Sequence, residues 1–195
     1  MRKTSSSASV LDRLLIHFPG DRPEKIAWRA HLLEVCEGFI ESGRAGTNFV
    51  QELSSGEVQK FWACLSEALI AKRLSGFEFG DRTVGVGPDF LVIDGNQKIW
   101  VEVICPEPIN IPEDWLSSGP NGSSLPHREI LLRWTSAIKA KAEALLGSAD
   151  GVHKGYMESG IVSSSDAYVI AVNGCRFRSG VFPQLHGISQ LPFAV

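Results

Sequence analysis

The chain has 195 residues, of which 44% are hydrophobic and 21% are charged, and its formal net charge is -3. This composition predicts a soluble globular protein that is long enough to bury a core. It contains no run of about 18 apolar residues, which excludes a transmembrane helix, and residues 1–11 lack the continuous apolar stretch of a secretory signal.

The cysteines and histidines are spaced too widely for a metal-binding motif. Cys36, Cys64, Cys105 and Cys175 form no CxxC pair, and the five histidines have no ligand spacing. Zinc is therefore not expected, and a reducing cytoplasm is the predicted location. The slightly acidic balance does not indicate nucleic-acid binding, although a local basic face would suffice for it.

Residues 1–54 are predicted to form a disordered start and a helical extension. The serine-rich residues 1–9 are expected to be disordered, and residues 10–18 are expected to form a short helix. A helix-start signal at Pro23 begins a second helix, which ends near Gly43.

A longer helix is expected from about residue 55 to residue 74. Ser54 followed by Glu57 has the spacing of a capping box at its start. The helix is apolar on most sides, so it is predicted to lie buried against a sheet. A first strand is expected around residues 77–79.

The pattern of residues 90–105 predicts a β-hairpin, because β-branched apolar runs flank a turn rich in Asp, Gly and Asn. With residues 95–96 as the turn, Asp89 lies opposite Glu102. Two carboxylates about 5 Å apart repel by roughly 3 kcal/mol at an effective dielectric of about 20. A divalent cation, a nearby Lys or Arg, or a protonated carboxyl group would offset this repulsion. The alternative is a ragged hairpin whose acids lie in water.

A second long helix is expected between Pro126 and Gly147. The apolar residues of its stripe are spaced by three and four, at Ile130, Trp134, Ala137, Ile138 and Leu145. Lys141 falls on the same stripe, so its ammonium group is placed to reach Asp89 and Glu102. The alternative is a side chain that extends from the edge of the stripe into water.

The apolar run at residues 167–172 predicts a strand that is buried on both faces. Because a helix crosses from the hairpin to this strand, parallel pairing is expected. The irregular segment at residues 106–124 is long enough to suggest a functional loop. Residues 173–195 end on apolar side chains, which suggests docking onto the body of the protein, a homodimer or another protein partner.

Pro88-Asp89, the hairpin turn and Glu102 resemble the motif of the PD-(D/E)XK nuclease superfamily, which has the restriction-endonuclease-like fold. The resemblance implies an α/β core of a helix, a three-strand meander, a helix and a strand within residues 55–195, preceded by the helical extension. Ile104 stands where the family motif has lysine. Variants of the family supply this cation from the following helix, which makes Lys141 the candidate.

The resemblance also implies a function, a metal-dependent endonuclease that hydrolyses phosphodiester bonds in DNA. Asp89, Glu102 and the backbone carbonyl of Val103 would bind Mg²⁺ or Mn²⁺. Lys141 would orient the attacking water or stabilise the transition state.

Three further residues are candidates for this site. Glu67 lies on the helix before the sheet, where the family often has a third carboxylate; pairing with Lys60 or Arg73 is an equal alternative. Arg133 and Ser136 lie on the turns before Lys141 and are candidates for phosphate binding, with Arg133 favoured for its bidentate geometry.

Two other functions stay open at this point. Ile104 and the acidic balance favour a catalytically inactive nuclease-like fold that binds nucleic acid or protein. An unrelated α/β protein would simply expose the two hairpin acids. Convergence of Asp89, Glu102 and Lys141 would favour the enzyme.

Overall fold

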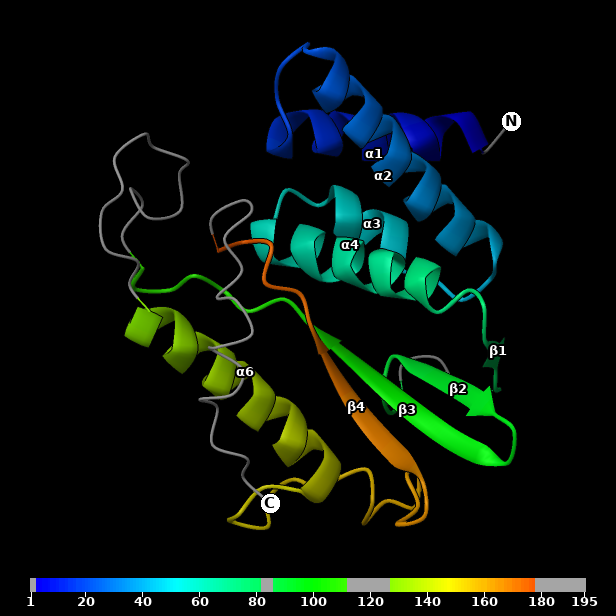
Figure 1. Ribbon diagram of the computed structural model, residues 1–195, viewed down its shortest axis with the longest axis vertical. Coiled ribbons are helices and arrows are strands. Elements are labelled where there is room, and N and C mark those ends of the chain that lie inside the picture. Colours follow the sequence, from blue (N-terminus) through cyan, green and yellow to red (C-terminus); the bar gives the residue numbers. More distant parts are fainter. Residues whose placement is uncertain (1–2, 82–85, 112–126, 178–195) are drawn as a thin grey trace. The chain divides into compact units, whose positions relative to one another are not determined.

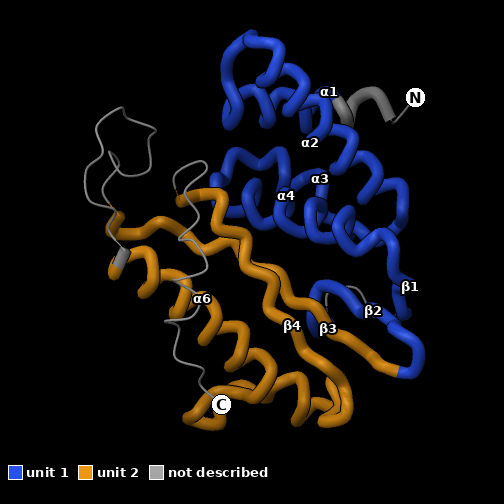
Figure 2. Tube along the Cα trace, viewed as in Figure 1, with its two compact units in different colours: residues 1–96 blue, residues 97–195 orange. Residues whose placement is uncertain are grey.

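The computed structural model describes residues 3–81, 86–111 and 127–177 (Figure 1). Within this part of the chain, five helices and four strands form a mixed α/β protein. The chain divides into two compact units, residues 1–96 and residues 97–195 (Figure 2).

The first unit begins with a helix where disorder was expected. Helix α1 spans Lys3–His17, so the prediction of disorder is wrong for residues 3–9. Val10 and Leu14 lie one turn apart on α1 and are both buried in the core of the unit. Packing of this apolar face outweighs the weak helix propensity of the serines before it.

Helix α2, Pro23–Glu41, begins at the predicted proline and ends two residues before Gly43, whose φ of 71° suits a glycine. One of its buried side chains is charged. Arg29 donates from Nη1 to the carbonyl oxygens of Phe18 at 2.7 Å and Gly20 at 2.6 Å. These bonds satisfy the buried guanidinium and hold the turn between α1 and α2.

The helix expected from about residue 55 to residue 74 is present, and a short helix that was not expected precedes it. Helix α3, Phe49–Ser54, was not predicted, and helix α4, Val58–Arg73, begins three residues later than expected. Ser54 is the last residue of α3 and not an N-cap, so the predicted capping box is wrong. The buried side chains of α4 are Phe61, Cys64, Leu65, Ser66, Ala68 and Ala71.

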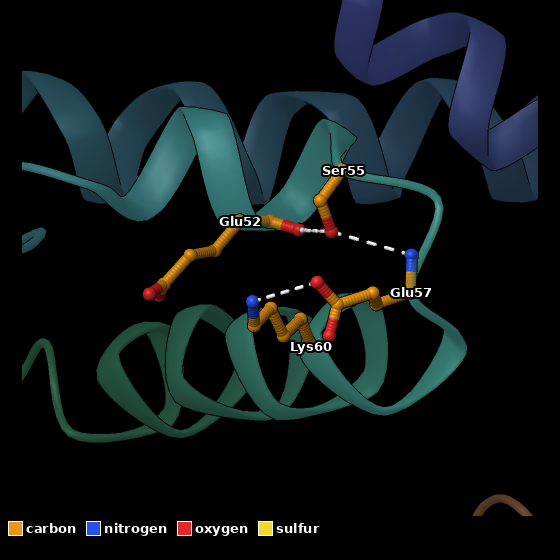
Figure 3. Close-up of polar contacts among 4 residues, drawn as sticks. All are labelled: Glu52, Ser55, Glu57 and Lys60. Carbon is orange, nitrogen blue, oxygen red and sulfur yellow. Dashed lines mark hydrogen bonds and ion pairs between the residues drawn. The ribbon is translucent and has the colours of Figure 1, made fainter.

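The connection between α3 and α4 has its own polar contacts (Figure 3). Ser55 Oγ donates to the Glu52 carbonyl at 2.9 Å and accepts from the Glu57 amide at 3.3 Å. The Glu57 carboxylate pairs with Lys60 at 2.7 Å. Glu57 is the N-cap residue of α4 but makes no side-chain capping bond. Its acidic side chain therefore forms an ion pair with the first turn of the helix and does not cap the helix end.

The first unit ends with two antiparallel strands. Strand β1, Glu78–Phe79, pairs with strand β2, Phe90–Asp94, and Phe79 lies opposite Val92. The chain turns at residues 95–96 directly after β2, as the polar turn signal predicted.

The second unit is built on a parallel pair of strands. Strand β3, Gln97–Ile104, pairs with strand β4, Ala167–Val172, and Glu102 lies opposite Ile170. The parallel direction confirms the sequence prediction. The prediction that β4 is buried on both faces is wrong, because no residue of β4 is fully buried and Val169 is 45% exposed.

A hydrogen-bonded acid anchors the start of β4. Asp166 Oδ2 accepts from the indole Nε1 of Trp100 on β3 at 3.0 Å and from the Ser163 amide at 3.0 Å. The Ser163 amide, followed by the Trp100 indole and the positive charge of Lys98, lowers the pKa of Asp166 below its ordinary value.

Helix α6, His127–Leu146, connects the two parallel strands and lies along the β3–β4 pair (Figure 1). Ile130, Trp134 and Ala137 from the predicted stripe are buried, and Gly147, with a φ of 94°, follows the helix end as expected. The stripe therefore predicted the face of α6 that packs on the strands.

Some predictions fall outside the described residues. These are residues 112–126, which include most of the irregular segment after β3, and residues 178–195, which include the apolar end of the chain. Docking of the C-terminal segment stays a prediction. Among the described residues, no helix combines the length and apolarity needed to cross a bilayer.

Candidate functional site

Glu102 is a buried acid in the middle of an apolar strand. It lies on β3 between Val101 and Val103, and only 4% of its surface is exposed. Transfer of a carboxylate from water to such surroundings is costly unless a partner compensates its charge. The backbone position is fixed by the parallel register, in which Glu102 faces Ile170.

Lys141 on α6 supplies that compensation. Its Nζ lies 2.5 Å from Glu102 Oε1, and the exposed fractions of the two side chains are 26% and 5%. The second carboxylate oxygen, Oε2, is buried. A charge-assisted hydrogen bond between an ammonium group and a carboxylate is among the strong polar contacts of proteins. The stripe on α6 therefore predicted correctly that Lys141 reaches Glu102.

Tyr168 strengthens the attachment of α6 at this point, and sequence reasoning missed it. Its hydroxyl on β4 donates to the backbone carbonyl of Lys141 at 3.2 Å. The bond therefore ties the helix backbone to the parallel strands at the residue that carries the ammonium group. No spacing signal identified Tyr168, because the contact depends on where the crossover helix lies on the two strands.

Asp89 lies directly before β2 in the first unit and is half-buried. The next residue, Phe90, is 1% exposed, and its ring centroid lies 6.0 Å from those of Phe39 on α2 and Phe79 on β1. These edge-to-face contacts fix the backbone beside Asp89. Because Asp89 belongs to the first unit and Glu102 to the second, their opposition stays a prediction.

Glu67 is half-buried on α4, also in the first unit. Burial, followed by the negative charge of Glu67, raises the pKa of the neighbouring Cys64 thiol to about 12. Lys60, one of the two partners considered for Glu67, pairs with Glu57. A role for Glu67 as a third carboxylate stays a prediction.

The remaining candidates lie in the second unit. Arg133 is half-buried on α6, whereas Ser136 is exposed. Val103 is buried on β3, where it lies opposite Ala171 in the parallel pair. The roles predicted for these three residues stay predictions, because they concern a bound metal ion or a substrate phosphate.

The donor chemistry of the candidate ligands suits a hard cation. Mg²⁺ is usually held by one or two carboxylates together with water and substrate phosphate, so Glu102 and Asp89 are appropriate ligand types. Among the described residues, no group of three or more His, Cys, Asp or Glu side chains is placed to hold a metal.

Comparisons with protein-family models, with curated proteins and with solved structures find no match for this chain.

Proposed function

We propose that this chain is a metal-dependent endonuclease that hydrolyses phosphodiester bonds in DNA on a restriction-endonuclease-like core. The observation that carries the proposal is the contact between Glu102, buried on β3, and Lys141 from the following helix. The resembling superfamily implies this pairing of acid and migrated lysine when the motif position itself, here Ile104, is not lysine.

Each candidate residue has a role that follows from its chemistry. Glu102 and Asp89, with the Val103 carbonyl, would hold Mg²⁺ or Mn²⁺. The bound metal would lower the pKa of a water molecule and stabilise charge on the scissile phosphate. Lys141 holds Glu102 in place through their ion pair, and its partly exposed side chain would offer the ammonium group to a phosphate oxygen on which negative charge develops.

Three other residues extend the proposed site. Arg133 would bind a phosphate of the substrate through the two parallel hydrogen bonds that a guanidinium can make, with Ser136 beside it on α6. Glu67 would complete the metal ligands from α4.

The alternative function is a catalytically inactive nuclease-like fold that binds nucleic acid or protein. The specific observation in its favour is the same ion pair, because Lys141 already offsets the charge of Glu102 without a metal. In this case the pair would stabilise the fold, and divalent cations would have no effect on the protein.

Cleavage of plasmid and single-stranded DNA in the presence of Mg²⁺ or Mn²⁺ tests the proposal. We expect Asp89→Ala, Glu102→Gln and Lys141→Met each to lower the rate by about 100-fold or more. Lys139→Met is the matched control, since Lys139 is an exposed lysine of α6 whose Nζ lies 3.6 Å from Glu143.

The outcome separates the two functions. Cleavage that is retained by the Lys139 variant and lost by the other three supports the enzyme. Absence of cleavage, with no shift of thermal stability by Mn²⁺ at any concentration, rejects the metal site. DNA binding measured under the same conditions would then support the inactive binding module.

A further inference from the structure

Strand β4 is an edge strand among the residues that the structure describes. It pairs with β3 on one side and with no described strand on the other side, which we call the outer edge (Figure 1). Proteins usually protect an edge strand from pairing with another chain by lysine, proline or a bulge. Residues 167–172 contain no charged residue and no proline, and they pair with β3 in an unbroken register. The sequence of β4 therefore provides none of these protections.

One hydrogen bond shows which backbone groups of β4 point to the outer edge. The Asn173 amide donates to the Ile104 carbonyl at 2.8 Å, directly beyond the end of the parallel register. Backbone groups alternate in direction along a strand, so the odd-numbered residues of β4 also bond β3. The amide and carbonyl groups of Ile170 and Val172 therefore point away from β3, to the outer edge.

The side chains of β4 alternate between the two faces of the parallel pair. The Tyr168 hydroxyl reaches the Lys141 carbonyl on α6, so the even-numbered side chains face that helix. Val169 points to the opposite face and is 45% exposed. A neighbouring strand at the outer edge would cover part of this β-branched side chain.

The charges that flank β4 have opposite signs at its two ends. Asp166 directly precedes the strand, and Arg176 lies in the segment that follows it. When two identical strands pair in the antiparallel direction, the start of each strand lies beside the end of the other. Such pairing brings each Asp166 to the end at which the partner's Arg176 lies, and opposite charges attract. Parallel pairing would bring like charges together, so the antiparallel direction is favoured.

We propose that two copies of this chain associate by antiparallel pairing of their β4 strands. The backbone groups of Ile170 in one copy bond those of Val172 in the other, and the same bonds recur about the two-fold axis. Both residues point to the outer edge, as hydrogen bonding between the copies requires. Because the paired segment is short, the expected dimer is weak, with a Kd of about 10–100 μM. This association does not depend on the proposed nuclease activity.

Sedimentation velocity of the whole chain, from low-micromolar to submillimolar concentration, measures the association. We expect the average mass to rise with concentration toward twice the mass of one chain. Hydrogen exchange at single amides locates the contact, because protection of Ile170 and Val172 should increase about threefold or more over the same range. The mass of a single chain at every concentration would overturn the proposal. Protection that does not change with concentration would also overturn it, because a segment of the same chain would then cover the outer edge.

An added lysine on β4 tests the surface through its side chain. Val169→Lys should raise the Kd of the dimer about tenfold or more, because lysine on an edge strand opposes pairing with another strand. The matched control is Val152→Lys, since Val152 is 70% exposed and lies outside β4 in the same unit. This control should leave the Kd unchanged. Equal effects of the two substitutions would contradict a contact at β4.

A proline on β4 tests the surface through the backbone. Ile170→Pro removes an amide that points to the outer edge and none that bonds β3, so the variant should be monomeric and still folded. A dimer that persists in both Ile170→Pro and Val169→Lys would place the contact elsewhere and overturn the proposal. If Ile170→Pro does not fold, the comparison of Val169→Lys with Val152→Lys decides the matter.

Discussion

Lys141 and Glu102 are joined by a 2.5 Å ion pair across 39 residues of sequence. The contact ties the crossover helix α6 to the buried strand β3. Removal of one partner would leave the other charged in surroundings of low polarity, whereas removal of both charges would not. The stability of the second unit therefore depends on the two residues as a pair.

Lys141→Met is expected to lower the free energy of unfolding by about 2–3 kcal/mol, because it leaves the Glu102 carboxylate without its cation. The double variant with Glu102→Gln should recover most of this loss, and Lys139→Met should cost less than about 0.5 kcal/mol. Urea unfolding of the unmodified chain and of these three variants measures the differences. Equal losses in the single and double variants would show that the ion pair does not couple the two sites.

Gly174→Ala and Gly38→Ala are expected to change stability in opposite directions. A Cβ at Gly174 would lie 2.7 Å from Trp134 Cζ2, a rigid neighbour, so a loss of about 1–3 kcal/mol is expected. A Cβ at Gly38 on α2 meets nothing within 4 Å, and alanine should add about 1 kcal/mol there through its helix propensity. Thermal unfolding of the two variants provides the comparison, and a neutral Gly174→Ala would contradict the close packing.

Asp166 should contribute a pH-dependent part of the stability. Its folded pKa is lowered, first by the Ser163 amide, so its charge stabilises the folded chain above the unfolded value of about 3.9. The contribution is lost as the pH falls through the folded pKa. Asp166→Asn should therefore be less stable than the unmodified chain at neutral pH, by less than about 1 kcal/mol because water screens the site.

This difference should shrink below about pH 4. Urea midpoints measured from neutral to acidic pH test the sign. A constant offset at every pH would mean that the shape of the side chain matters and its charge does not.

Glu57→Asp is expected to stabilise α4 by about 0.5–1 kcal/mol. Glu57 occupies the N-cap position with extended backbone but makes no side-chain capping bond, and aspartate is among the preferred N-cap residues. Loss of the exposed ion pair with Lys60 should offset little of the gain. Chemical unfolding should show a higher midpoint for the variant. A lower midpoint would mean that the ion pair with Lys60 stabilises the helix more than the aspartate cap does.

Periodicity predicted the elements whose faces differ in polarity. The spacing of Ile130, Trp134 and Ala137 identified the packed face of α6, and from it the approach of Lys141 to Glu102 followed. The turn at residues 95–96 also followed from its residue types. These features depend on the residue types of one turn or on the apolar face of one helix, so a single sequence contains enough information to predict them.

Other features depend on packing between segments that the sequence alone does not align. The burial of Val10 and Leu14 favours a helix at α1 despite its serines. The spacing of apolar residues in the sequence also did not reveal where α3 ends and α4 begins. Spacing could not predict the contact of Tyr168 with the Lys141 carbonyl, because no regular interval connects those two positions.

The parallel pairing of β3 with β4 has a consequence for the order of folding. Gln97 Nε2 at the start of β3 bonds the carbonyl of Ser165, which lies 68 residues away and just before β4. The chain must close this long loop before any contact between the two strands forms, whereas contacts between the helices of the first unit close shorter loops, such as the 41 residues from Arg13 to Ser54. We therefore expect amide protons of α2 and α4 to gain protection from hydrogen exchange earlier during refolding than those of β3 and β4.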